Sequence, residues 1–140
     1  MLLAIRTDTA TTELFLMTPG GVIVARDRWE SGRQLSSQLL DHIQKLLQKQ
    51  NSTWSALAGI IVFRGPGSFT GLRIGVTVAN AIAYAQSIAI VGTLGDTWLE
   101  EGAQRLRHKE DDTQVIPEYG ALPHITKPGS RLDADGGSAV

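Results

Sequence analysis

The sequence predicts an α/β fold with one mixed five-stranded sheet and helices on its faces. Three short apolar segments joined by tight turns come first, as in an antiparallel meander. Two further apolar segments, 57–63 and 88–93, are each followed by a stretch in which apolar residues recur at helical spacing. A meander followed by alternating strands and helices forms a mixed sheet that helices cover.

The strands of the meander are expected at residues 2–6, 12–17 and 22–29. Pro19-Gly20-Gly21 is a turn signal between the second and the third. The middle segment is apolar at successive positions, so both of its faces should be covered.

Helices are expected at 33–50, at 70–86 and after residue 97. The resulting order β-β-β-α-β-α-β-α is that of a single ribonuclease H-like or actin-like ATPase lobe. The lobe should span residues 1–107. Residues 108–140 begin with a charge run and then hold prolines and glycines without periodicity, which predicts an extended or disordered tail, disordered from about Ser130.

Polar residues that can cap a helix mark the expected helix starts. Ser31 and Gln34 have the spacing of a capping box, with the glutamine three residues after the serine. Asp96 or Thr97 is the expected cap of the third helix.

Composition limits the function classes. The chain has 140 residues, a formal net charge of −1 and no cysteine. A near-neutral chain does not bind nucleic acid by bulk electrostatics, and the lack of cysteine excludes disulfides and thiolate metal sites. The N-terminus lacks the features of a signal peptide, and no apolar run reaches the roughly 20 residues of a membrane span. We expect a soluble cytoplasmic protein.

The segment RGPGSFTGLRIG, residues 64–75, is the most distinctive motif. It lies between a buried strand and a helix, where α/β folds bind ligands and where a helix N-terminus favours anions. It lacks the lysine of a nucleotide P-loop, and its spacing G-x-G-x-x-x-G is one residue longer than the dinucleotide fingerprint. Two interpretations stay open, a turn with a helix cap and a possible anion site. Their residues are Gly65, Pro66, Gly67, Ser68, Thr70 and Gly71.

The helix after this loop is apolar nearly all round. Its polar residues form one narrow stripe, and small residues recur every fourth position. Such a helix should be buried on most sides, which predicts that it and the helix at 33–50 form a subunit or partner interface. The alternative is a helix wedged between the first helix and the sheet. The expected interface residues are Leu39, Ile43, Leu46, Leu72, Arg73, Gly75, Val76, Ala79, Asn80 and Ala83.

Catalytic and metal-binding patterns are not found. The histidines do not form an HxxH or HxxxH pair, and His42 is expected to be solvated on its helix. Asp8, Glu13 and Asp41 are the candidate acids of a metal-dependent nuclease, but Arg6 on the first strand would repel a divalent cation. We therefore expect no catalytic residue, no metal and no cofactor.

The chain resembles the bacterial TsaB family over roughly residues 1–106. The resemblance lies in the motif RGPGSFTGLRIG, the opening LLAIRTDTATTELFL and the helix SSQLLDHIQKLL. The resemblance implies an actin-like ATPase fold without chemistry of its own, a non-catalytic scaffold or activator of TsaD in threonylcarbamoyladenosine modification of tRNA. It also implies a complex with the ATPase TsaE, helix packing at 33–50 and 70–86 against the partner or in a homodimer, and only indirect contact with tRNA.

Two departures from the family pattern stand out. The family's first strand usually ends in aspartate where this chain has Arg6. The usual second lobe is also missing. The segment PEYGALPHITKPG resembles the family's C-terminal end. The competing hypotheses are a weak nucleotide hydrolase that uses the glycine loop and an RNA-binding module that uses Arg64, Arg73, Arg105 and Arg107.

Overall fold

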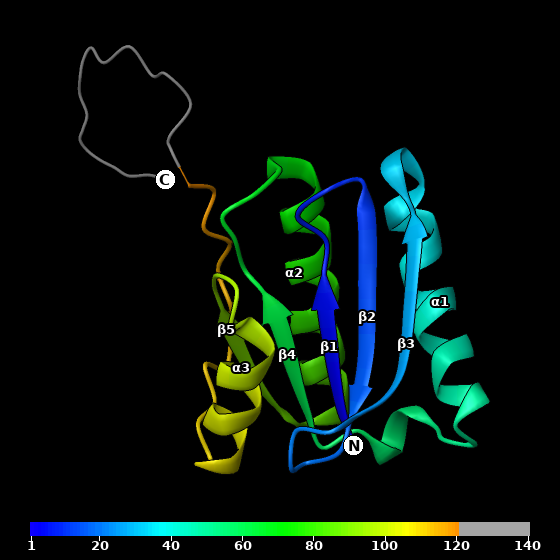
Figure 1. Cartoon of the computed structure of the whole chain (residues 1–140), viewed down its shortest axis with the longest axis vertical. Helices are drawn as coiled ribbons and strands as arrows, with labels where there is room; N and C mark the ends of the chain where they lie inside the picture. The colour runs from blue at the N-terminus through cyan, green and yellow to red at the C-terminus, as the bar shows by residue number, and fades with distance from the viewer. Residues whose placement is uncertain (121–140) are drawn as a thin grey trace.

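A computed structural model describes residues 1–120, and the tail segment expected to be disordered from Ser130 lies outside the described residues. One five-stranded sheet carries three helices (Figure 1). The α/β expectation and the order of its elements are confirmed. The elements are β1 (Leu2–Arg6), β2 (Thr11–Met17), β3 (Ile23–Glu30), α1 (Leu35–Lys49), β4 (Gly59–Phe63), α2 (Phe69–Gln86), β5 (Ala89–Thr93) and α3 (Trp98–Arg107).

The sheet has the strand order β3-β2-β1-β4-β5. β1, β2 and β3 form the antiparallel meander, while β4 and β5 run parallel to β1. β1 lies at the centre, where Leu3 pairs with Leu16 on one side and Ile60 on the other. The carboxyl ends of β1, β4 and β5 therefore meet at one edge, which is where the glycine loop begins.

The two faces of the sheet have separate cores. α1 and α2 cover one face over a cluster that includes Leu3, Leu16 and Ile60, and α3 covers the other over Ala4 and Ile61. In Figure 1, α2 runs behind the strands and α3 lies in front of β4 and β5. The middle strand β2 is buried at Leu14–Met17, as its apolar pattern predicts.

The helix starts differ from the expected caps. Ser31 does not cap a helix, because its hydroxyl is buried and bonds to the Thr12 hydroxyl (2.7 Å) and the Ala10 carbonyl (3.2 Å). A short 3₁₀ turn, Gly32–Gln34, follows, and α1 begins at Leu35. Thr97 holds the N-cap position of α3 without a side-chain capping bond.

Residues 108–120 form no helix or strand, yet they stay attached to the sheet. Val115 is buried in the core under α1 and α2, and the Glu118 N–H donates to the Arg64 carbonyl (2.6 Å). The lobe predicted for 1–107 ends with α3, but the described part of the tail packs against that lobe. A domain boundary at residue 107 stays a prediction.

No helix within residues 1–120 has the length and apolar character that crossing a membrane requires.

The last turn of α2 gives a test of the backbone geometry. Ser87 ends the helix in the left-handed region, with φ of 56°. Glycine takes this conformation without the steric cost that serine meets, so Ser87→Gly should raise the free energy of unfolding by about 0.5–1 kcal/mol in urea denaturation. Ser36→Gly, at an exposed right-handed position of α1, should lower it. Equal effects of both changes would contradict the assigned geometry.

Candidate functional site

The glycine loop, residues 64–71, comprises the connection from β4 to α2 and the first residues of α2, at the carboxyl ends of β1 and β4. Gly65 has φ of 131°, a conformation that favours glycine, and a side chain there would overlap the Glu118 carbonyl. The loop is thus enclosed by backbone from the far end of the described chain.

A row of glycines brings the start of α2 against the end of β1. A Cβ on Gly67 would overlap Asp8, and one on Gly71 or Gly75 would overlap Thr7. Thr7 is 1% exposed, and its hydroxyl donates to the Gly71 carbonyl at 2.7 Å. Gly71 thus lies against the backbone of Thr7, and Gly67 and Gly75 leave room for the side chains of Asp8 and Thr7, which supports the turn interpretation of the motif.

The hydroxyls of the loop do not cap the helix. Ser68 holds the N-cap position, but its side chain forms no capping hydrogen bond. Its backbone N–H instead donates to the Asp8 carbonyl at 3.1 Å. Ser68 and Thr70 are exposed, so the capping part of the turn-and-cap interpretation is wrong as regards side chains.

Arg6 and Asp8 form an ion pair at the carboxyl end of β1. The Arg6 guanidinium donates to both oxygens of Asp8, at 2.8 and 3.1 Å, and lies 4.0 Å from the centre of the Phe63 ring. The hydrogen bonds to Asp8 raise the pKa of Arg6 above its ordinary value, against the opposing effect of burial. The Asp8 carboxylate, beside Gly67 of the loop, is thus already paired with a fixed cation.

The other candidate acids lie apart and have partners of their own. Glu13 lies 3.7 Å from Arg28, and Asp41 lies 2.9 Å from Lys45 on the surface of α1. Within residues 1–120 no three acidic or histidine side chains gather as a metal site would require.

His42 is not solvated as expected. Its ring stacks on Trp29 with centroids 3.6 Å apart, and its Nδ1 lies 2.8 Å from an Asp27 oxygen. This contact fastens α1 to the edge strand β3.

The expected interface residues are mostly buried inside the chain. Those that face its own core are Leu39, Ile43, Leu46, Leu72, Gly75, Val76, Ala79 and Ala83. Arg73 is exposed, while the Asn80 side chain is bonded to the backbone of Val115. The part of α2 that is open to another protein is its exposed side, whose residues are Phe69, Thr70, Arg73, Thr77, Ala81, Tyr84 and Ala85.

Residues 110–118, which we call the strap, were missed by sequence reasoning. They hold Val115 in the core and place Glu118 and Tyr119 beside the loop, where the Tyr119 and Phe69 rings lie 4.5 Å apart. The sole signal was the apolar pair Val115-Ile116 within a polar stretch, too short to show periodicity.

Comparison with known proteins identifies the family. The family model of TsaD, tRNA N6-adenosine threonylcarbamoyltransferase, matches residues 16–94, more than half of the chain. The chain belongs to the TsaD family. Within this family it is TsaB-like, as two curated relatives and a solved structure show.

The TsaB-like character is seen in sequence and structure. The tRNA threonylcarbamoyladenosine biosynthesis protein TsaB of Escherichia coli is 28% identical over 89 residues, 64% of this chain and 37% of that protein. The TsaB of Bacillus subtilis is 33% identical over 89 residues, 64% of this chain and 38% of that protein. YeaZ from Pseudomonas aeruginosa superposes with a TM-score of 0.61 at 29% identity, over 66% of this chain and 43% of that one. This TsaB-like chain thus spans less than half the length of these three relatives.

Replacement of one glycine tests the close approach. Gly71→Ala places a methyl group against the Thr7 carbonyl and should lower the free energy of unfolding by about 1–3 kcal/mol in urea denaturation. Gly20→Ala, where the nearest atom lies 3.7 Å from the added carbon, is the matched control and should change it by less than about 0.5 kcal/mol. If the two variants were equally stable, α2 would not be packed against β1 as described.

Proposed function

We propose that this TsaB-like chain is a non-catalytic scaffold that binds a TsaD-type protein in the biosynthesis of threonylcarbamoyladenosine on tRNA. The match to the TsaD family and to curated TsaB proteins supports this role most strongly. The matched residues 16–94 include α1 and α2, the two helices that share one face of the sheet.

The end of β1 supports the absence of chemistry. This chain holds an Arg6–Asp8 pair against Phe63 at the end of β1. Mg²⁺ is held by carboxylate oxygens, and the Asp8 oxygens are already bonded to the Arg6 guanidinium, whose positive charge opposes a cation there. The glycines of the loop are accounted for by packing against Thr7 and Asp8.

The outer face of α2 is the proposed contact with the partner. Tyr84 is 90% exposed, and Ala81 and Ala85 beside it leave a low surface on which a second helix can pack closely. An exposed tyrosine beside small residues is a frequent anchor of protein interfaces. The same surface would serve a homodimer when the TsaD-type protein is absent.

The remaining parts of the proposal follow from this contact. A TsaE-type ATPase would join through the assembled complex, and tRNA would meet the TsaD-type subunit rather than this chain. The complex would assemble in the cytoplasm, where tRNA is modified.

Co-purification with the TsaD-type protein of the same organism tests the proposal. Ala81→Arg adds a long charged side chain to the outer face of α2 and should weaken the complex by at least about tenfold, or 1.4 kcal/mol, in calorimetric titration. Ala79 and Ala83 are unsuitable for this purpose because they are buried, and an arginine there would unfold the chain.

Gln104→Arg is the control, since it adds the same side chain to an exposed position of α3 on the opposite face of the sheet. It should leave the affinity unchanged. A wild-type chain that does not bind the TsaD-type protein would end the proposal, and equal affinities of the two variants would move the contact away from α2.

A further inference from the structure

A cavity of about 590 Å³ lies at the carboxyl ends of β4 and β5. Its floor is the end of β5, residues 92–94, and its two walls are α3 and residues 114–116 of the strap. Ligand sites in parallel sheets lie at the carboxyl ends of the strands, and cavities that hold small molecules usually measure about 300–1,000 Å³. The position and the size of this cavity therefore suit a small ligand.

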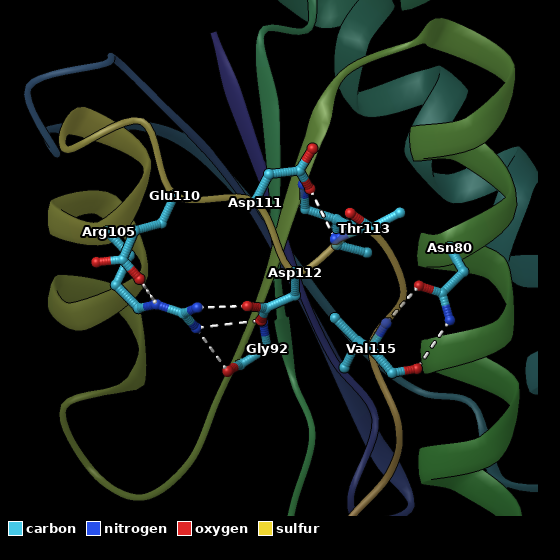
Figure 2. Close-up of polar contacts among 9 residues, drawn as sticks. Asn80, Gly92, Arg105, Glu110, Asp111, Asp112, Thr113 and Val115 are labelled. Carbon is cyan, nitrogen blue, oxygen red and sulfur yellow. Dashed lines mark hydrogen bonds and ion pairs between the residues drawn. The ribbon is translucent and has the colours of Figure 1, made fainter.

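The charged groups on the α3 side of the cavity are bonded to one another. Arg105 of α3 binds Glu110 and Asp112 of the strap and also donates to the Gly92 carbonyl at 3.2 Å, as Figure 2 shows. Asp112 also accepts a hydrogen bond from the Gly92 N–H at 2.8 Å. Arg105 is thus committed to holding the strap against β5 and α3, and it is not the group that would receive a ligand.

Arg64 is the other arginine of the cavity, and its guanidinium has no partner of this kind. Its N–H donates to the Thr93 carbonyl at 2.9 Å, and its stem lies over Gly92, where an added Cβ would come within 2.7 Å of the Arg64 Cδ. Among residues 1–120, the Arg64 side chain forms no hydrogen bond or ion pair. A guanidinium whose stem is held in this way can bind a carboxylate or a phosphate through two parallel hydrogen bonds.

The charge of Arg64 acts inside the cavity. Burial would raise the pKa of Asp112, but hydrogen bonds from Arg105 and Gly92 lower it. The positive charge of Arg64 lowers that pKa further. Arg64 therefore lies near the Asp112 carboxylate without a direct bond to it.

The lining charges favour a ligand with a single negative charge. Two arginines, Arg64 and Arg105, and two acids, Glu101 and Asp112, line the cavity, so their charges cancel. A dianion such as phosphate would meet both carboxylates with only one uncommitted cation in the described part of the chain. A single carboxylate needs only Arg64.

Apolar side chains lie beside this cation. Leu94 at the end of β5 is 41% exposed, Ile116 of the strap is 68% exposed, and both line the cavity. A ligand with an apolar body would remove part of this surface from water, which favours its binding by about 25 cal/mol for each Å² that it covers. The cavity thus combines one arginine that can receive an anion with two exposed apolar side chains.

We propose that this cavity binds a small monocarboxylate with an apolar body, whose carboxylate pairs with Arg64 and whose apolar part covers Leu94 and Ile116. The outer face of α2 does not line the cavity. The inference is therefore independent of the proposed binding to a TsaD-type protein.

Titration of the isotopically labelled full chain with N-acetyl-leucine at neutral pH, followed by nuclear magnetic resonance, tests the proposal. Saturable shifts are expected at the Gly92, Leu94 and Ile116 amides and at the Arg64 Nε–H, at low millimolar concentrations that fit so small a ligand. The amide of N-acetyl-leucine has the same body without the charge, and inorganic phosphate has charge without the body. Both should bind at least about tenfold more weakly.

Two variants test the two parts of the site. Arg64→Met keeps a stem over Gly92 but removes the charge, and it should weaken the binding of N-acetyl-leucine at least about tenfold. Ile116→Glu replaces an exposed apolar side chain by a like charge and should weaken it as well. Arg33→Met is the matched control, because Arg33 is exposed and follows β3 at the opposite edge of the sheet. It should leave the affinity unchanged.

The proposal is overturned if the wild-type chain shows no saturable shifts at these positions. Equal binding of N-acetyl-leucine and its amide would show that the carboxylate is not recognised, and tighter binding of phosphate would show a site of another class. Unchanged affinity in Arg64→Met or Ile116→Glu would place the ligand elsewhere. Should Arg64→Met lose the dispersed spectrum of a folded chain, Ile116→Glu and the comparison of acid with amide decide.

Discussion

The close approach of α2 to the end of β1 is the contact on which the arrangement of this lobe depends. Gly67, Gly71 and Gly75 present backbone where any side chain would meet Thr7 or Asp8, and the Thr7 hydroxyl bonds into the first turn of the helix. This contact fixes both the position and the rotation of α2. The rotation in turn decides that Ala79 faces the core and that Ala81 and Tyr84 face outward.

The same corner of the fold gives a packing explanation for a loop whose sequence also suits phosphate. Arg6 pairs with Asp8 and lies on Phe63, while the Glu118 N–H bonds to Arg64 at the start of the loop. Three segments distant in sequence thus meet where an actin-like lobe would face its ligand. The Arg6 and Asp8 side chains are paired with each other, and the Ser68 and Glu118 N–H groups donate to the Asp8 and Arg64 carbonyls, which favours a structural role for the motif.

Sequence patterns predicted the elements well because each is locally determined. The apolar segment at 57–63 and the glycine loop after it hold enough signal to place β4 and α2 within about two residues.

The sequence did not show which apolar residues the chain buries by itself. Leu39 and Ala79 were assigned to a partner because apolar spacing does not reveal how much surface the chain itself covers, and α1, α2 and the sheet together bury both. The Ser31 cap failed for a similar reason, since its hydroxyl is taken by Thr12, a contact across the sheet. The strap was hidden because its bonds to β5 join Asp112 with Ile90, with no local pattern to mark them.

The central claim is that the glycine loop serves packing and leaves the chain to act by binding a partner. Nuclear magnetic resonance of the labelled chain during titration with ATP and Mg²⁺ tests it most directly, because it reads the loop amides one by one. The account predicts that the amide signals of Gly67, Ser68 and Gly71 do not shift at millimolar nucleotide. Saturable shifts confined to these amides, absent for Gly20 and Gly95, would show that the loop binds phosphate and would contradict the account.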